Sequence, residues 1–258
     1  MNKLFLIAGP CVVENETTPR QIAERVKEIC AKLGIEYIFK ASYKKANRTR
    51  LDSFTGIDMK AALEIIAGIG EDLRLKTITD IHESHEVEEV ARYVDYLQIP
   101  AFLCRQTDLL LAAGESGKGV NIKKGQFVSP EAMKFPLEKV QSTGNQNVWL
   151  CERGFTLGYE NLVVDATSVA RMKQHGVPVV MDCTHSLQQP NKSEGISGGN
   201  PDMIETVALS AVATGADGLF IETHPDPANA LSDGQSMLPL EKLERILKKV
   251  VKIKDALS

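Results

Sequence analysis

Short apolar runs alternate with longer amphipathic stretches along the whole chain. The first run, residues 4–8 (LFLIA), ends at Gly9-Pro10, and an apolar run of this length next to turn residues is typical of a buried parallel strand. Seven similar runs follow, so we predict eight strands, over residues 4–8, 36–42, 75–80, 95–100, 119–124, 147–153, 178–184 and 218–223.

Between these runs, apolar residues recur at the spacing of one helix face, as Ile22, Val26 and Ile29 do. The clearest of these stretches predict helices over 19–33, 202–215 and 239–256. Eight strand–helix units in a chain of this length predict a single-domain (β/α)8 TIM barrel over residues 1–258. An open doubly wound sheet is the alternative, but no GxGxxG follows the first predicted strand.

Two connections, 186–201 and 224–238, are long for a compact domain. Long ordered loops are usually functional, and both follow strands at the end where barrels carry their active sites. We expect 186–201 to act as a lid. Because the first predicted strand already begins at residue 4, the pattern does not identify what closes the floor of the barrel.

Composition places the chain among ordinary globular proteins, with 43% hydrophobic and 25% charged residues. No apolar run reaches the roughly 18 residues of a membrane-spanning helix, and Gly9-Pro10 interrupts the only stretch that resembles a signal peptide. We therefore expect no membrane partner. The net charge of −4 argues against a nucleic-acid partner, which needs a basic field.

The five cysteines are odd in number and widely spaced, with no CxxC pair. This usage argues against a disulfide framework and predicts a reducing, cytoplasmic location.

In a barrel, the polar residues at the strand ends converge on one mouth. These residues are Cys11, Lys40, Ser42, Lys45, Asp80, His82, Gln98, Lys123, Arg153, Asp182, His185, Glu222 and, in the last loop, Asp233. Five cations belong to this region, namely Lys40, Lys45, Arg48, Lys123 and Arg153. Clustered cations repel unless an anion neutralises them, so we predict a phosphate or carboxylate ligand.

Cys11, His185, Glu222 and Asp233 form a second chemical class. A thiolate, an imidazole and two carboxylates suit a divalent transition metal. The alternative for Cys11 is a buried apolar role, and His185 could equally serve as a phosphate donor or a core residue.

A series of motifs, in order over nearly the whole chain, resembles the 3-deoxy-D-manno-octulosonate 8-phosphate synthase family. The motifs are IAGPC, KASYKKANRTR, TDIHE, LQIPAFLCRQTDLL, NIKKGQF, CERG, NLVVD, DCTHSLQQP and GLFIETHPDPANALSDG. The resemblance implies a (β/α)8 barrel enzyme, usually a homotetramer. It implies condensation of phosphoenolpyruvate with D-arabinose 5-phosphate on the route to the lipopolysaccharide inner core.

The resemblance also implies roles for single residues. Those expected at the phosphate of phosphoenolpyruvate are Lys123, Arg153, Ser42 and the Ala101 backbone; those at its carboxylate are Lys45, Lys40 and Gln98. Those expected at the sugar are Asn47, Arg48 and Thr49, which would hold its phosphate, and Asp80, which would face its hydroxyls. Lys45 is the expected proton donor to the aldehyde oxygen, and His185 and Asp233 complete the catalytic set.

Some members of this family require a divalent metal and carry cysteine at the position of Cys11, whereas metal-independent members carry asparagine there. Cys11, His185, Glu222 and Asp233 match the ligands of the metal-requiring type, so the resemblance implies Fe, Zn, Mn or Co. The loop SDGQS, 232–236, is closer to the metal-independent branch.

Two other functions stay open at this point. The related 3-deoxy-D-arabino-heptulosonate 7-phosphate synthases use erythrose 4-phosphate and show a KPRTS-like stretch where this chain has KANRTR, which makes Asn47 the discriminating residue. A non-catalytic phosphosugar-binding barrel would keep Lys123 and Arg153 but would not need four metal-type residues.

Overall fold

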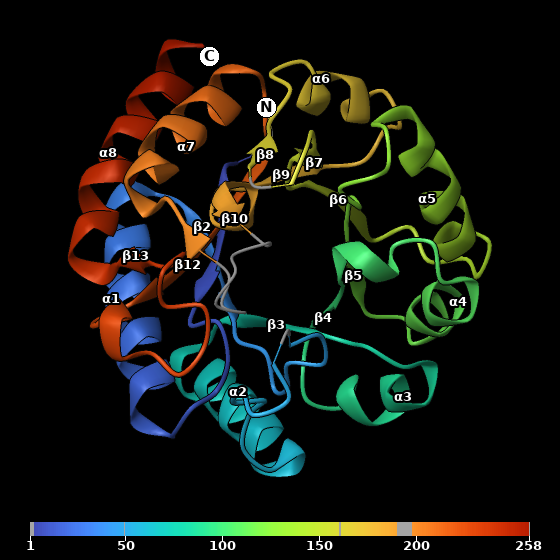
Figure 1. The fold of residues 1–258 in the computed structure, drawn as a ribbon, viewed down its shortest axis with the longest axis horizontal. Helices are drawn as coiled ribbons and strands as arrows, with labels where there is room; N and C mark the ends of the chain where they lie inside the picture. Colours follow the sequence, from blue (N-terminus) through green and yellow to red (C-terminus); the bar gives the residue numbers. More distant parts are fainter. Residues whose placement is uncertain (1–2, 49, 160, 190–197, 258) are drawn as a thin grey trace.

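Eight parallel strands close into a barrel in this computed structural model, which describes residues 3–48, 50–159, 161–189 and 198–257. The strands are β1 (Phe5–Gly9), β2 (Glu36–Lys40), β3 (Lys76–Asp80), β4 (Tyr96–Ile99), β5 (Gly119–Lys123), β6 (Val148–Glu152), β9 (Val179–Asp182) and β12 (Gly218–His224). Pairing of β1 with β12 closes the ring, as Figure 1 shows from one end. The prediction of a (β/α)8 barrel is confirmed.

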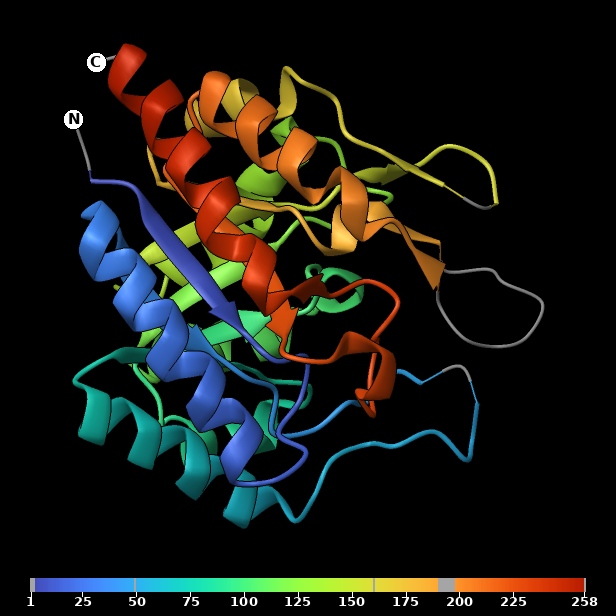
Figure 2. The ribbon, with the colours of Figure 1, turned by 90° about the vertical axis from the view of Figure 1, so that its left-hand side faces the viewer.

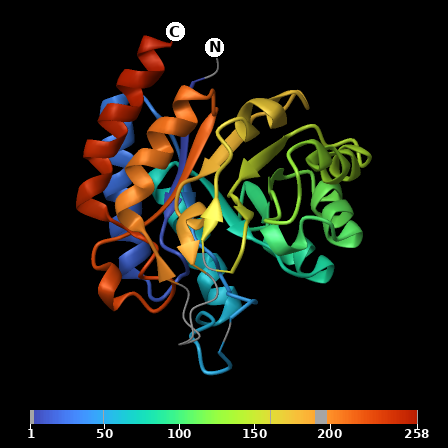
Figure 3. The same cartoon turned by 45° about the horizontal axis from the view of Figure 1, so that its top comes forward.

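Eight α-helices among the described residues surround the barrel (Figure 1). They are α1 (Thr17–Leu33), α2 (Met59–Leu73), α3 (Val87–Val90), α4 (Thr107–Glu115), α5 (Lys134–Gln141), α6 (Ser168–Lys173), α7 (Ile204–Ala213) and α8 (Leu240–Ala256). Short 3-10 helices are η1 (Ser84–Glu86), η2 (Ala101–Leu103), η3 (Glu131–Met133), η4 (His185–Leu187), η5 (Pro201–Met203) and η6 (Pro227–Asn229). Neighbouring helices pack side by side, as α7 and α8 do in Figure 3. None of the described helices is both long and apolar enough to cross a membrane.

The strongest helix predictions hold, with small shifts at their ends. Helix α1 starts two residues before the predicted 19–33, because the Asn15 side chain accepts hydrogen bonds from the backbone N–H groups of Thr17 and Thr18. The predicted helix 202–215 opens as the 3-10 helix η5 before α7 begins at Ile204.

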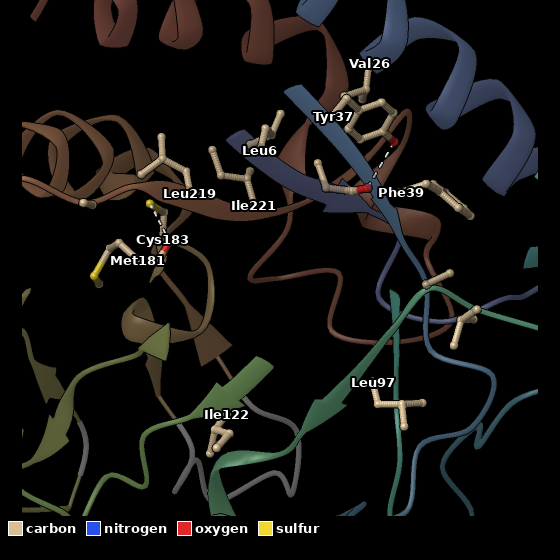
Figure 4. Packing of buried hydrophobic residues seen from close by; sticks show 14 of the residues in the cluster. Leu6, Val26, Tyr37, Phe39, Leu97, Ile122, Met181, Cys183, Leu219 and Ile221 are labelled. Carbon is tan, nitrogen blue, oxygen red and sulfur yellow. Dashed lines mark hydrogen bonds between the residues drawn. The ribbon is translucent and has the colours of Figure 1, made fainter. Parts of the chain in front are cut away.

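The main core lies between the barrel and its helices. Figure 4 shows Leu6, Val26, Tyr37 and Ile221 in this layer, contributed by strands and by α1. Tyr37 buries its ring there and donates its hydroxyl hydrogen to the carbonyl oxygen of Ala8, at 3.1 Å, so its polar atom is satisfied.

Three aromatic rings close the floor of the barrel. The ring of Trp149 lies between Phe5 and Tyr96, with centroid distances of 4.8 and 4.3 Å. Two glycines make room for these rings: a Cβ on Gly119 would lie 2.1 Å from the ring of Tyr96, and one on Gly218 would lie 2.4 Å from the ring of Phe5. The floor is therefore sealed by residues of the strands themselves.

The opposite end of the barrel carries the longer loops. Figure 2 shows β1 pointing away from the two termini and toward these loops. Short strand pairs that the periodicity did not predict lie in the loops or beside the barrel, namely β7 (Phe155–Thr156) with β8 (Leu162–Val163), β10 (Gln188–Gln189) with β11 (Gly198–Gly199), and β13 (Leu238–Pro239) with β12. Residues 190–197 of the predicted lid lie outside the described residues.

Candidate active site

One large cavity, of about 1090 Å³, opens among the loops at the carboxyl ends of the strands. The predicted site residues that line it are Lys45, Asn47, Arg48, Asp80, Ala101, Lys123, Arg153, His185 and Asp233. Those that lie buried behind this lining are Cys11, Lys40, Ser42, Gln98 and Glu222. Thr49 lies outside the described residues. The polar residues at the predicted strand ends therefore do lie together around one cavity.

A second cavity, of about 390 Å³, contains none of the predicted site residues. It borders Lys124, whose ammonium lies 3.3 Å from the Glu152 carboxylate and contacts three backbone carbonyls. The Glu152 carboxylate balances the charge of Lys124, and the carbonyls accept its hydrogen bonds. Lys124 therefore does not offer the second cavity an unpaired cation for an anionic ligand.

Asp182, at the end of β9, holds two cavity-lining groups together. Its Oδ2 accepts hydrogen bonds from Lys123 Nζ at 2.6 Å and from His185 Nδ1 at 2.8 Å. Burial alone would raise the pKa of Asp182, but His185 and Lys123 outweigh it and lower that pKa well below its ordinary value. The carboxylate therefore stays ionised and fixes both partners.

Lys123 is also supported from below by an aromatic ring. Its ammonium lies 3.8 Å from the centroid of Phe220, a β12 residue whose side chain fills the middle of the barrel. Burial would lower the pKa of Lys123, but Asp182 raises it above its ordinary value, so this group remains a cation.

Arg153 follows β6 and lies buried beside Lys123 at the cavity wall. One of its N–H groups, Nη2, donates to Gln188 Oε1 at 2.9 Å. Nε and Nη1 are buried and have no partner among the described residues. A buried guanidinium with unused donors is costly, so this geometry suits an anion that accepts from both nitrogens.

Lys40 and Glu222 form a buried ion pair at the centre of the mouth. The Lys40 ammonium donates to Glu222 Oε1 at 2.6 Å and to the carbonyl oxygen of Cys11 at 3.1 Å. Burial would raise the pKa of Glu222, but Lys40 and His185 lower it well below its ordinary value. Lys40 is therefore already neutralised, unlike Arg153.

Lys45 follows β2 and lines the cavity. Burial would lower its pKa, but the negative charges of Glu222, Asp80 and Asp233 raise it above its ordinary value. Lys45 therefore carries a proton at neutral pH.

Asp80, at the end of β3, faces the cavity and is held from behind. Ser42 Oγ donates to its Oδ2 and Gln98 Nε2 donates to its Oδ1. Gln98 is in turn held by Asn121 of β5, whose Nδ2 donates to Gln98 Oε1 at 2.9 Å. Asp80 is thus the cavity-facing end of a buried chain of hydrogen bonds.

Arg48 joins the loop after β2 to the loop after β12. Its Nη1 donates to Asp233 Oδ1 at 3.0 Å and its Nε to the carbonyl oxygen of Phe54, while Nη2 is buried without a partner among the described residues. Asp233 has a left-handed backbone, with φ of 49°, which is uncommon for a residue with a side chain.

The four metal-type residues meet as two pairs. Cys11 Sγ lies 3.3 Å from Asp233 Oδ2, and His185 Nε2 lies 3.5 Å from Glu222 Oε2. Within the described part of the chain, no three His, Cys, Asp or Glu side chains are already gathered around one point as a metal site. The donors are therefore neighbours without a preformed coordination sphere.

Their chemistry nevertheless fits a divalent transition metal. Glu222 Oε2 is buried and has no hydrogen-bond partner among the described residues, which leaves a free oxygen donor facing His185. Burial, followed by the charges of Asp233 and Glu222, raises the pKa of the Cys11 thiol well above its ordinary value. Lys45 and Lys40 oppose this shift but do not outweigh it, so without a bound metal Cys11 keeps its proton and donates it toward Asp233.

The sequence patterns placed Asp182 at the mouth but gave it no role, and the geometry makes it the partner of Lys123 and His185. Two further residues of this network were not singled out by the sequence. Ser232 lies 3.0 Å from Cys11 Sγ, and Asn121 reaches Gln98 from inside the barrel. Neither contact has a local sequence signal.

Comparison with known proteins gives a family and a group of named relatives. The family model described as the DAHP synthetase I family matches residues 1–258. A 2-dehydro-3-deoxyphosphooctonate aldolase of Desulfotalea psychrophila is 49% identical over 255 residues, which cover 99% of this chain and 91% of that protein. The proteins of the same name from Koribacter versatilis and Fusobacterium nucleatum are each 47% identical, over 99% and 97% of this chain and 93% and 90% of their own lengths.

Proposed function

This chain belongs to the DAHP synthetase I family, and we propose that it is the enzyme that forms 3-deoxy-D-manno-octulosonate 8-phosphate from phosphoenolpyruvate, D-arabinose 5-phosphate and water. Relatives at 47–49% identity over nearly the full chain share a name for this octulosonate activity, which supports it over the erythrose 4-phosphate alternative and over a non-catalytic role.

The observation that carries the proposal is a pair of arginines with unused donors at one cavity. Arg153 has two buried unpartnered N–H groups, and Arg48 has one at Nη2. Two phosphorylated substrates supply an anionic acceptor for the unused donors of each arginine.

The first anion subsite is built by Arg153 and Lys123. Arg153 would hold the phosphate of phosphoenolpyruvate through Nε and Nη1, and Lys123 adds a point charge that Asp182 and Phe220 keep in place. Ser42 and the Ala101 backbone belong to the same expected phosphate set. Lys45, with Lys40 and Gln98 behind it, would face the carboxylate.

The second subsite lies at the loop after β2. Arg48 Nη2, with Asn47 and Thr49 beside it in the chain, would bind the sugar phosphate, and Asp80 would accept hydrogen bonds from the sugar hydroxyls. Asp80 can do this as an acceptor because Ser42 and Gln98 hold its carboxylate toward the cavity.

The chemistry follows from these positions. C3 of phosphoenolpyruvate attacks the aldehyde carbon, a C–C bond forms, and Lys45 gives a proton to the oxygen that becomes negative. A water oxygen adds to C2 and loses one proton. The C2–O bond to phosphate then breaks, and the new C2 hydroxyl passes its remaining proton to the departing phosphate, which leaves the keto group and inorganic phosphate. Fixed cations such as Lys123 and Arg153 stabilise the charge that develops.

A divalent metal completes the proposal. Cys11, His185, Glu222 and Asp233 would hold the ion, which would supply Lewis-acid polarisation of a substrate oxygen. Fe, Zn, Mn and Co all suit this donor set. Asp182 fixes the ring of His185, so its Nε2 faces Glu222 and stays available.

The metal set is tested by spectroscopy as well as by activity. After chelation, we expect phosphate release to stop, and cobalt loading of the metal-free protein to give the absorption of a cobalt–thiolate bond. Cys11→Ser should lose that absorption, whereas Cys30→Ser, in α1, should keep it. An unchanged spectrum in Cys11→Ser would exclude Cys11 as a ligand.

Substrate choice is tested by measuring phosphate release from phosphoenolpyruvate with each aldose phosphate. We expect turnover with arabinose 5-phosphate and none with erythrose 4-phosphate. The reverse preference would assign the chain to the heptulosonate branch instead.

We further propose a cytoplasmic homo-oligomer, with four copies as the expected state. All five cysteines are free, which suits a reducing compartment. Phe102, Phe127 and Leu157, on loops beyond β4, β5 and β6, are exposed apolar side chains that subunit contacts could cover. Sedimentation of the purified protein tests the number of copies.

A further inference from the structure

Asn121 is a polar residue fully buried inside the barrel, one layer below the mouth. Its neighbours across the sheet are Gln98 on β4 and Trp149 on β6. Its Nδ2 donates to Gln98 Oε1 at 2.9 Å, whereas its Oδ1 has no partner among the described residues. A buried amide with one unsatisfied end costs free energy, so packing alone does not account for it.

The direction of the hydrogen bonds explains this arrangement. Ionised Asp80 can only accept, so Gln98 must turn its Nε2 toward Asp80 and its Oε1 toward Asn121. Asn121 must then turn its own Nδ2 toward Gln98, which leaves Oδ1 on the far side. The orientation of each amide is therefore dictated by the carboxylate that faces the cavity.

We propose that Asn121 is a positioning residue for the reaction, because it fixes the Gln98 amide and through it the Asp80 carboxylate that meets the sugar. The inference rests on the proposed function for the identity of the sugar substrate. Asn121 does not line the cavity, so it acts only through Gln98. Its effect should be largest on the sugar side of the site, where Asp80 lies, and smaller on the phosphoenolpyruvate side, which Gln98 supports only from behind Lys45.

The sharpest test is Asn121→Asp, which keeps the shape and removes the donor. Gln98 must then turn its Nε2 toward residue 121, which brings its Oε1 against Asp80 and disturbs that carboxylate. We expect KM for arabinose 5-phosphate to rise about 10-fold or more and KM for phosphoenolpyruvate to rise by a clearly smaller factor, about 3-fold or less. An equal change in both KM values, or in neither, would overturn the proposal.

Two further variants separate positioning from a general effect on the core. Thr79→Val removes another buried oxygen without a partner, on the face of β3 opposite to Asp80, and should leave both KM values unchanged. Asn121→Leu tests the position without a buried charge, and should raise the sugar KM less than Asn121→Asp does. If Thr79→Val shifts the sugar KM as far, the effect is not specific to this chain of hydrogen bonds.

A double-mutant cycle with Gln98→Leu completes the experiment. If Asn121 acts through Gln98, adding Asn121→Leu to Gln98→Leu should change kcat/KM by less than about 2-fold. Independent, multiplying losses would refute the proposed route. Wild-type turnover with arabinose 5-phosphate is measured in the same series. If the proposed function is wrong, the wild-type protein will not turn over this sugar; if only the role of Asn121 is wrong, the wild type will be active and the Asn121 variants will not show the expected KM changes.

Discussion

The floor and the mouth of the barrel are filled by opposite kinds of side chain. At the floor, Phe5, Tyr96 and Trp149 pack ring against ring, and the Lys76 ammonium lies 5.6 Å from the centroid of the Tyr96 ring. At the mouth, Lys40 and Lys123 are buried against Glu222 and Asp182. Aromatic burial stabilises a fold directly, whereas buried ion pairs roughly balance their own desolvation cost. The floor therefore supports stability, and the mouth holds charges whose use lies in binding.

The contrast is strongest at Arg153, which is buried with two unused donors. In Arg153→Met we expect kcat/KM for phosphoenolpyruvate to fall about 10³- to 10⁴-fold, because a charged two-point phosphate contact is lost. Burial lowers the pKa of Arg153, so removing the cation should not reduce the free energy of unfolding. Steady-state kinetics gives kcat/KM, and denaturant unfolding of the same sample gives the free energy of unfolding. A variant that is less stable but has normal kinetics would show that Arg153 serves the fold and does not bind substrate.

Trp149→Ala should show the opposite behaviour. The change opens a cavity between two rings, and we expect the free energy of unfolding to fall by about 3–4 kcal/mol. Activity per folded molecule should fall far less than in Arg153→Met, because Trp149 reaches the mouth only through its cross-sheet neighbour Asn121. Trp149→Phe is the matched control and should cost about 1 kcal/mol. A loss of activity without a loss of stability would show that floor and mouth are not separable.

A smaller effect is expected at the glycine that admits Tyr96. A Cβ at residue 119 would lie 2.1 Å from that ring, so Gly119→Ala must displace it and should cost about 1–3 kcal/mol. Gly117→Ala, at a turn with φ of 70°, lacks any close neighbour and gives the cost of backbone strain alone for comparison. Thermal unfolding of both variants separates the ring contact from strain.

The smallest effect concerns pH and tests the mouth alone. Burial would raise the pKa of Asp80, but Lys40, Lys45 and Lys123 lower it below its ordinary 3.8. The ionised form therefore stabilises the fold above that value, and this contribution is lost as the pH falls toward the lowered pKa. Asp80→Asn should flatten the loss of stability between about pH 4 and pH 2, on the order of 1 kcal/mol. If the free energy of unfolding of Asp80→Asn falls with decreasing pH as steeply as that of the wild type, the pKa of Asp80 is not lowered in the fold.

The pattern of hydrophobic residues predicted the barrel well because each strand is a short buried run. The predicted segments 119–124 and 218–223, for example, contain β5 and most of β12. The two-residue strands β7 and β8 could not be predicted, since two residues have no periodicity. The aromatic floor depends on which rings share the interior face, and that follows from register across three strands.

The sequence predicted which residues form the site, but it did not predict which of them contact one another. Strand ends located Lys123 and Arg153 at one mouth. The sequence could not show that Asp182, 59 residues further on, neutralises Lys123 while Arg153 keeps unused donors. This difference depends on the geometry of the barrel, because Asp182 and Gln188, the partners of Lys123 and Arg153, lie far from them in the sequence.

The seam between β1 and β12 also affects how the molecule is made. Cys11 meets Ser232 and Asp233 across 221 and 222 residues of chain, so a ribosome must make nearly the whole barrel before these groups can meet. Until the loop after β12 is in place, the thiol lacks its contacts with Ser232 and Asp233. The reactivity of Cys11 toward an alkylating reagent during synthesis therefore reports when the barrel closes.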